Sequence, residues 1–144
     1  MQNATTTILA FDVGKRRIGV AIADSIARLA RPLKTISNSK QVIETLQTLI
    51  AEQTAESVVV GVPRGLEGQD TQQTVETKAF IDGLRGKLTI PVYEQDEAVT
   101  SVQAEAELAT RQPAYNKGDI DALAATYILE DFLRTGTEQH HGQV

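Results

Sequence analysis

Cysteine is absent from the 144 residues of this chain, which excludes disulfides, thiolate metal sites and cysteine nucleophiles. No apolar run approaches the roughly 18 residues that a membrane-spanning helix needs. The first five residues also lack the basic and apolar stretches of a secretory signal. These absences predict a cytoplasmic protein without a membrane segment.

Aromatic residues are few, at 4% of the chain, and the two histidines are His140 and His141, near the C-terminus. Few aromatics argue against recognition of nucleic acid by stacking bases on aromatic platforms. Two histidines in a polar tail give little support to serine–histidine catalysis. With 41% hydrophobic residues, the composition is that of one globular domain. We predict that this domain covers residues 1–134 and that residues 135–144 form a disordered tail.

Positive charge is scarce overall, because the net charge is −5, but it is concentrated near the N-terminus. Residues 1–34 carry six cations against two carboxylates, a charge of +4, so the other 110 residues carry −9. Phosphate binding depends on local potential rather than on the total. The N-terminal segment is therefore a candidate surface for nucleic acid, although chance clustering of solvated charge would give the same pattern.

Hydrophobic periodicity divides the chain into strands and helices. Apolar runs bounded by turn residues predict strands over 7–11, 18–23, 33–36, 57–62 and 90–95. Helical spacing predicts helices over 39–54 and 71–85, a third opening at a Thr100–Gln103 capping box, and a last one starting near Asp119. In the second of these helices, the apolar residues expected to face inward are Val75, Ala79, Phe80 and Leu84.

The order of these elements predicts the fold class. Short connections between the first three strands favour antiparallel pairing, and the helices that follow favour parallel crossovers. The expected fold is α/β, with a mixed five-stranded sheet flanked by helices, as in ribonuclease-H-like domains. The pattern alone also allows other α/β folds.

Acidic residues occur at three separate points where such a fold gathers its site, the carboxyl ends of strands. Asp12 follows the first strand, Asp96 and Glu97 follow the fifth, and Asp121 falls in the first turn of the last helix. Carboxylates grouped in this way suit Mg²⁺ or Mn²⁺, which take hard oxygen ligands together with water and phosphate. Taken singly, each acid also has a structural explanation, as a turn residue, a solvated side chain or a partner of the helix dipole.

The segment from Asp12 to Gly19 contains an acid, two glycines and three consecutive cations, Lys15, Arg16 and Arg17. Gly14 permits backbone geometry that other residues avoid and lets a phosphate approach closely, while the cations are candidate phosphate contacts. A hairpin with solvated tips is the alternative. Further candidate contacts to nucleic acid are Arg31, Arg64 and Lys117.

These segments resemble the YqgF/RuvX family of ribonuclease-H-like nucleases. Residues 12–21 match its first motif, approximately Asp-x-Gly-x-x-Arg-Ile-Gly-Val-Ala. Residues 30–33 match its Ala-Arg-Pro-Leu segment, residues 60–63 resemble its Val-Gly-Leu-Pro strand end, and residues 116–125 resemble its C-terminal motif. The similarity runs from about Ile8 to Leu133, and the order and spacing of the motifs make it specific.

The resemblance implies a divalent-metal-dependent nuclease that trims the 5′ end of precursor 16S rRNA, or that resolves Holliday junctions in branched DNA. It implies Asp12, Glu97 and Asp121 as the catalytic, metal-binding set, with Asp96 as the competing assignment for the middle position. Partners would be structured RNA or branched DNA, and the protein would be a monomer or a homodimer.

One departure from the family stands after the fifth strand. The family has Asp-Glu-Arg there, whereas this chain has Asp96-Glu97-Ala98 and so keeps both acids but loses the arginine's charge. This motivates a rival reading, a nucleic-acid-binding module without catalysis. A sugar-kinase-like or actin-like ATPase is a second rival, because that class has a similar Asp-x-Gly loop, but it needs two such domains.

Overall fold

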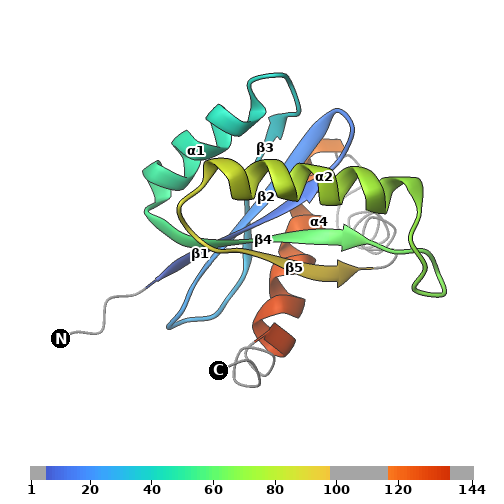
Figure 1. The fold of residues 1–144 in the computed structure, drawn as a ribbon. Coiled ribbons are helices and arrows are strands. Elements are labelled where there is room, and N and C mark those ends of the chain that lie inside the picture. Colours follow the sequence, from blue (N-terminus) through green and yellow to red (C-terminus); the bar gives the residue numbers. More distant parts are fainter. Residues whose placement is uncertain (1–5, 98–116, 137–144) are drawn as a thin grey trace.

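The computed structural model describes residues 6–97 and 117–136 (Figure 1). In chain order the elements are β1 (Thr7–Val13), β2 (Arg17–Asp24), β3 (Arg31–Ser37), α1 (Val42–Gln53), β4 (Ala55–Pro63), α2 (Gln72–Lys87), β5 (Val92–Glu97), α4 (Lys117–Asp131) and a π-helical turn (Phe132–Gly136). None of the helices in these described ranges is long and apolar enough to span a membrane.

The five strands form one sheet in the order β3-β2-β1-β4-β5. β2 is antiparallel to both β1 and β3, whereas β4 runs parallel to β1 and β5 runs parallel to β4. The predicted antiparallel start and parallel crossovers are therefore confirmed, and the mixed sheet is the expected ribonuclease-H-like arrangement.

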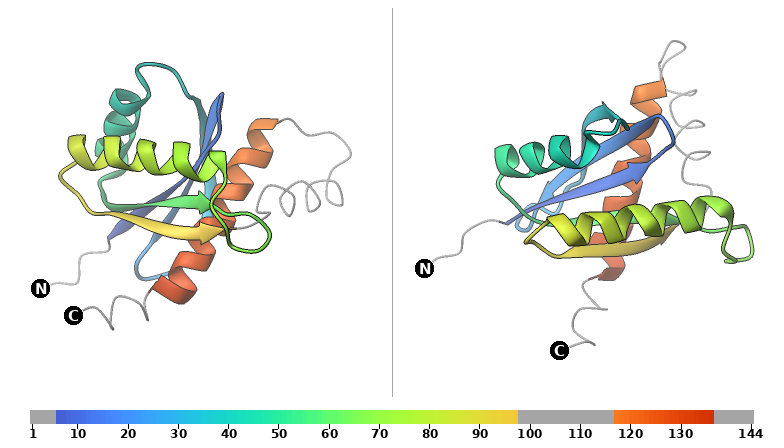
Figure 2. Two further views of the ribbon diagram at one scale, coloured as in Figure 1. Left: turned by 45° about the vertical axis from the view of Figure 1, so that its right-hand side comes forward. Right: turned by 45° about the horizontal axis from the view of Figure 1, so that its top comes forward.

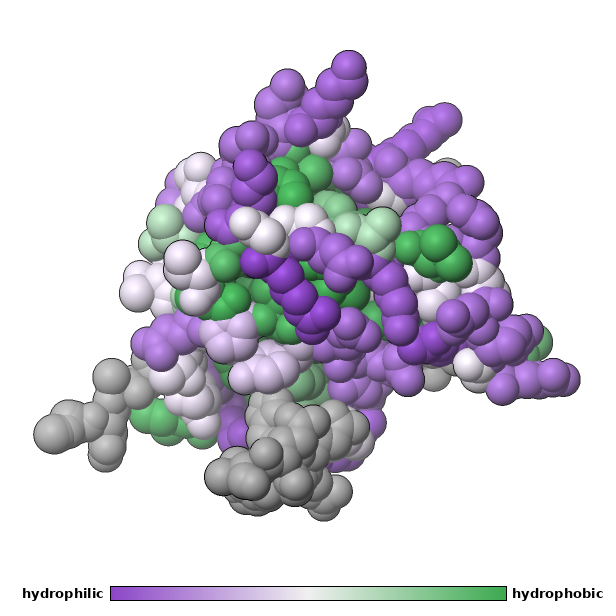
Figure 3. Space-filling view, viewed as in Figure 1, coloured by the Kyte–Doolittle hydropathy of each residue, from purple (hydrophilic) through white to green (hydrophobic). Residues whose placement is uncertain are grey.

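Helices cover both faces of the sheet: α1 and α2 lie on one face and α4 lies on the other (Figure 2). Along β1, Leu9 and Phe11 enter the core under α1 and α2, while Ala10 enters the core under α4. Successive strand residues point to opposite faces, so a strand buried on both sides reads as an unbroken apolar run. The outer surface on the α1 and α2 side is mostly hydrophilic, with hydrophobic side chains visible between polar ones (Figure 3).

The inner face of α2 differs from the prediction. Val75 is 56% exposed and Ala79 is exposed, while the buried residues are Thr74, Thr77, Ile81 and Leu84. The prediction was wrong for Val75 and Ala79, whereas Leu84 is buried and Phe80 packs partly buried against the core, as expected. It missed Thr74 and Thr77 because it counted only apolar residues as buried. Thr74 is polar, but its hydroxyl donates to the carbonyl of Pro63 and completes the capping box with Thr71, so its burial leaves no unpaired hydroxyl.

Several element boundaries also differ, and three of them bear on the site or on the C-terminal tail. β5 continues to Glu97 instead of ending at Gln95, because its parallel ladder with β4 extends to the Pro63–Glu97 pair and overrides the low strand propensity of acidic residues. α4 begins at Lys117 rather than near Asp119, which places Asp121 beyond the first turn. Helical structure continues to Gly136. The helix predicted at Thr100 and residues 137–144 lie outside the described residues, so the tail stays a prediction.

Candidate functional site

Asp12 and Asp121 meet where α4 crosses the sheet. In the β1–β2 hairpin, Asp12 stands opposite Gly19. A side chain at Gly19 would have its Cβ only 1.9 Å from the carbonyl oxygen of Asp121. The helix backbone therefore rests directly on β2 at this glycine, and strand alternation points Asp12 to the same face as Ala10, under α4.

The two carboxylates interact electrostatically. Burial, and then the charge of Asp121, raise the pKa of Asp12 from 3.8 to about 7. The protonated form of the Asp12 carboxyl is therefore populated near neutral pH, chiefly because the carboxyl is buried. On the other side, Arg17 Nε donates a hydrogen bond of 2.7 Å to Asp121 Oδ2.

A pocket of about 420 Å³ opens beside this pair, and we call it the Asp121 pocket. It is lined by Asp121 and by the loop residues Gly14, Lys15, Arg16 and Arg17. The three cations predicted to contact phosphate therefore gather around one hollow, next to the two acids. Arg17 gives one of the five N–H donors of a guanidinium to Asp121, so it has others to offer to an anion.

Asn38 fixes the loop that carries these cations, and sequence reasoning missed it. Its side-chain Nδ2 donates 2.7 Å to the carbonyl of Gly14, and its backbone N–H donates 2.9 Å to the carbonyl of Arg16. The Gly14 N–H in turn donates 2.9 Å to the Arg17 carbonyl. The only sequence signal was an Asn directly after a strand, which commonly indicates a turn.

We expect Asn38→Ala to lower the free energy of unfolding by about 1 kcal/mol, the usual net value of one hydrogen bond. The nuclease activity that the family resemblance implies should fall on the order of tenfold, because the loop cations lose their fixed position. Urea denaturation and initial cleavage rates measure the two effects. Asn38→Asp also lacks the side-chain donor and should behave in the same way. The control Ser37→Ala, at an exposed position, should change neither stability nor activity. Full activity in Asn38→Ala would show that the hydrogen bond from Asn38 to Gly14 is dispensable.

The two acids of β5 point to opposite faces of the sheet. Val92 packs under α1 and α2, whereas Tyr93 packs under α4. Alternation then places Glu97 on the α4 face, which it shares with Asp12, and Asp96 on the α2 face. Asp96 pairs there with Arg64 at 3.2 Å. Of the two candidates for the middle position, only Glu97 is therefore on the side of Asp12 and Asp121.

Glu97 nevertheless lies further along the sheet than the pair. Phe11, next to Asp12, is in register with Val60, whereas Glu97 is in register with Pro63. Within residues 6–97 and 117–136, no group of three His, Asp or Glu side chains is arranged to hold a metal ion. The donor chemistry of the Asp12–Asp121 pair still fits Mg²⁺, because this ion binds through one or two carboxylates and completes its shell with water and phosphate.

Arg31 and Arg64, two of the other predicted contacts to nucleic acid, lie apart from the pair. Arg31 is paired with Ile22, at the opposite end of β2 from Arg17. Arg64 is held by Asp70 and Asp96 on the α2 side. Lys117 begins α4, but its side chain is outside the described part of the structure.

Comparison with known proteins agrees with this architecture. The chain matches the RuvX family, described as Holliday junction resolvase, over residues 6–135. A Chloroflexus aggregans protein named "Putative pre-16S rRNA nuclease" is 44% identical over 131 residues, covering 88% of this chain and 92% of the relative. A Paraburkholderia phytofirmans protein of the same name is 37% identical and covers 93% and 92%.

Solved structures show the same fold at low sequence identity. RuvC of T. thermophilus in complex with a Holliday junction substrate has a TM-score of 0.58 at 17% identity, with 92% of this chain and 97% of that chain covered. The fowlpox virus Holliday junction resolvase has a TM-score of 0.52 at 12% identity, with 90% and 99% covered. The family match spans nearly all of the described residues, and this chain belongs to the RuvX family of nucleases with a ribonuclease-H-like, RuvC-like fold.

Proposed function

We propose that this protein is a divalent-metal-dependent nuclease that hydrolyses phosphodiester bonds in the 5′-end processing of precursor 16S rRNA. The observation that carries the proposal is the meeting of Asp12 and Asp121 at the end of β1, beside a pocket lined by three cations. Acids paired in this way are suited to a cation, and the cations of the loop are suited to the phosphates on either side of the cut.

In this proposal Asp12 and Asp121 hold Mg²⁺ or Mn²⁺, and Glu97 is the further acid on the same face. The bound ion would activate water and neutralise charge at the phosphate. Lys15 and Arg16 bind flanking phosphates from the exposed loop. Arg17 orients the Asp121 carboxylate through its 2.7 Å hydrogen bond and directs its remaining donors to the pocket. The absence of a side chain at Gly14 lets the phosphate backbone approach the loop.

The choice of precursor rRNA rests on the relatives, which carry that substrate in their names. The family description and the solved RuvC complex name the Holliday junction, so branched DNA is the competing substrate. Contacts to phosphate and metal do not themselves distinguish the two.

The test is a side-by-side cleavage assay on precursor 16S rRNA and a synthetic four-way DNA junction, with Mg²⁺ and with Mn²⁺. We expect specific cleavage near the 5′ end of the rRNA, and we expect Asp12→Asn to lower the rate by at least a hundredfold while binding persists. Cleavage of the junction alone would transfer the proposal to branched DNA. Tight binding without cleavage in either metal would favour a binding module, a reading motivated by Ala98 at the place of the family arginine.

A further inference from the structure

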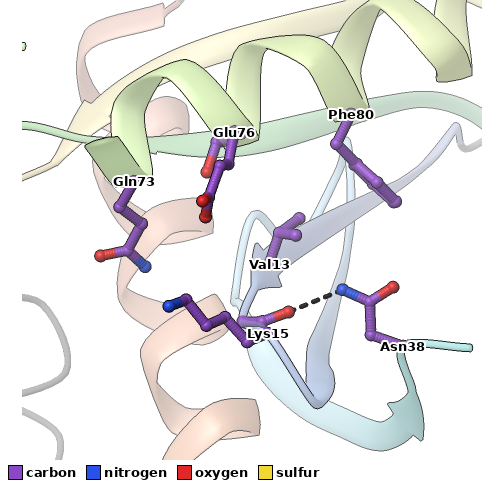
Figure 4. A pocket seen from close by; sticks show the side chains of 8 residues that line it. Val13, Lys15, Asn38, Gln73, Glu76 and Phe80 are labelled. Atoms are coloured by element: carbon purple, nitrogen blue, oxygen red, sulfur yellow. Dashed lines mark hydrogen bonds between the residues drawn. The ribbon is translucent and has the colours of Figure 1, made fainter. Parts of the chain in front are cut away.

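A second pocket, of about 130 Å³, lies behind the cation-bearing loop, on the α2 side of the sheet (Figure 4). We call it the α2 pocket. Gly14 and Lys15 line both this pocket and the Asp121 pocket. The loop therefore separates the two pockets. A nucleic-acid strand that crosses the loop would reach the acids on one side of it and α2 on the other.

The interior of the α2 pocket suits a flat, uncharged ring. Val13 and the half-buried Phe80 supply apolar walls, and Thr77 is 2% exposed. A closed cavity of about 150 Å³ accepts benzene, so an open pocket of about 130 Å³ admits the edge of a base while the rest of the ring stays outside it. Binding of a single base in this pocket does not depend on stacking against several aromatic residues, which are few in this chain.

The polar lining of the α2 pocket combines the Glu76 carboxylate with the amides of Asn38 and Gln73 and the Lys15 ammonium. Glu76 points from α2 toward the loop (Figure 4), and its Oε2 receives one bond of 3.2 Å from Gln72 Nε2. A carboxylate has about four acceptor sites, so Glu76 can accept more. Asn38 gives its Nδ2 to the Gly14 carbonyl, which leaves its Oδ1 as the group available to a ligand. Gln73 adds an amide.

We propose that the α2 pocket binds one unstacked guanine base of the substrate strand, adjacent to the phosphate held in the Asp121 pocket. Guanine presents two neighbouring donors, N1–H and the 2-amino group, which match the two oxygens of the Glu76 carboxylate. Uracil has a single N–H between two carbonyl oxygens, which the carboxylate repels, and cytosine and adenine have one amino group each. Bases in single strands are commonly splayed out and read along these edges. The inference rests on the proposed function and adds base preference to it.

The test maps every cut in RNA hairpins whose single-stranded positions are randomised, using the full chain with Mg²⁺. We expect guanine to be enriched about tenfold at one fixed position within two nucleotides of the cut, the discrimination that a bidentate contact gives. Glu76→Gln should abolish the enrichment. Asp82→Asn removes the same charge from an exposed position on the same helix and should keep it.

Inosine lacks the 2-amino group, so placing it at the enriched position should slow cleavage by the wild type about fivefold. The cleavage rate of Glu76→Gln should not change. Efficient cleavage with no base preference, or with a preference that survives Glu76→Gln, overturns the α2 pocket and leaves the proposed nuclease standing. If no cleavage occurs at all, the proposed nuclease fails. Fluorescence anisotropy with guanine- and inosine-containing oligonucleotides then decides: a preference for guanine lost in Glu76→Gln supports the pocket, and equal affinities overturn it.

Discussion

Asp12→Asn is expected to stabilise the metal-free protein at pH 8 by as much as about 4 kcal/mol and by about 1 kcal/mol at pH 4.5. The pKa of Asp12 is 3.8 in the unfolded chain and is raised to about 7 in the fold. Between these values the native state holds a proton that the unfolded state has released, so stability falls as the pH rises through this window. Above pH 7 the full cost remains, and asparagine removes it.

Urea denaturation in EDTA at pH 4.5 and pH 8.0 measures this difference. Asp82→Asn, at an exposed position of α2, is the matched control and should alter stability little at either pH. Equal gains of Asp12→Asn at both pH values would mean that the buried charge is not the cause.

Asp12→Asn also distinguishes the effect of metal binding on stability from the stability of the metal-free fold. Ligands that bind only the native state stabilise it by mass action, so Mg²⁺ at pH 8 should raise the stability of the wild type. It should do so far less for Asp12→Asn, which has lost a carboxylate ligand. A protein that gains stability and loses cleavage in one substitution is what a site built from mutually repelling acids predicts.

The local half of the site is the part that the sequence predicts most directly, although the acids at the strand and helix ends were also expected to gather. β1, the glycine-containing loop and Arg17 lie within a few residues of one another, and their apolar runs and turn residues are strong signals. The position of Asp121 relative to Asp12 depends instead on where α4 crosses the sheet, about a hundred residues later in the chain. Only Gly19 marks that crossing, and a glycine within a strand signals a close approach without naming the partner.

Polar residues with structural roles were the least predictable. Asn38 and Thr74 act through backbone carbonyls, at Gly14 and Pro63. Such bonds leave no pattern in side-chain hydropathy, because the partner atom is the same in every residue. Asp96 and Glu97 can be assigned to opposite faces of the sheet only when β5 is known to continue to Glu97. The predicted end of this strand was two residues too early, so the assignment could not be made from the sequence.

Gly19→Ala should have the largest effect on the fold, destabilising it by about 3 kcal/mol or more. The new Cβ would fall 1.9 Å from the Asp121 carbonyl oxygen and 2.8 Å from the backbone nitrogen of Ala122. Backbone atoms have no rotamer to change, so α4 must move away from β2. Where the variant is still folded, as checked by circular dichroism at low temperature, we expect cleavage to fall on the order of a hundredfold, because Asp121 is displaced from Asp12.

Two other glycines show whether crowding alone explains this result. Gly61→Ala also pushes on α4, but it meets the Ile128 side chain, with Cδ1 at 2.3 Å. It should destabilise by about 1–3 kcal/mol and retain cleavage when folded, because Asp121 keeps its backbone position. Gly86 in α2 has open space around its Cβ position, so Gly86→Ala should stabilise by up to about 1 kcal/mol. If folded Gly19→Ala cleaves as fast as Gly61→Ala, the close approach of α4 at Gly19 does not position the acid.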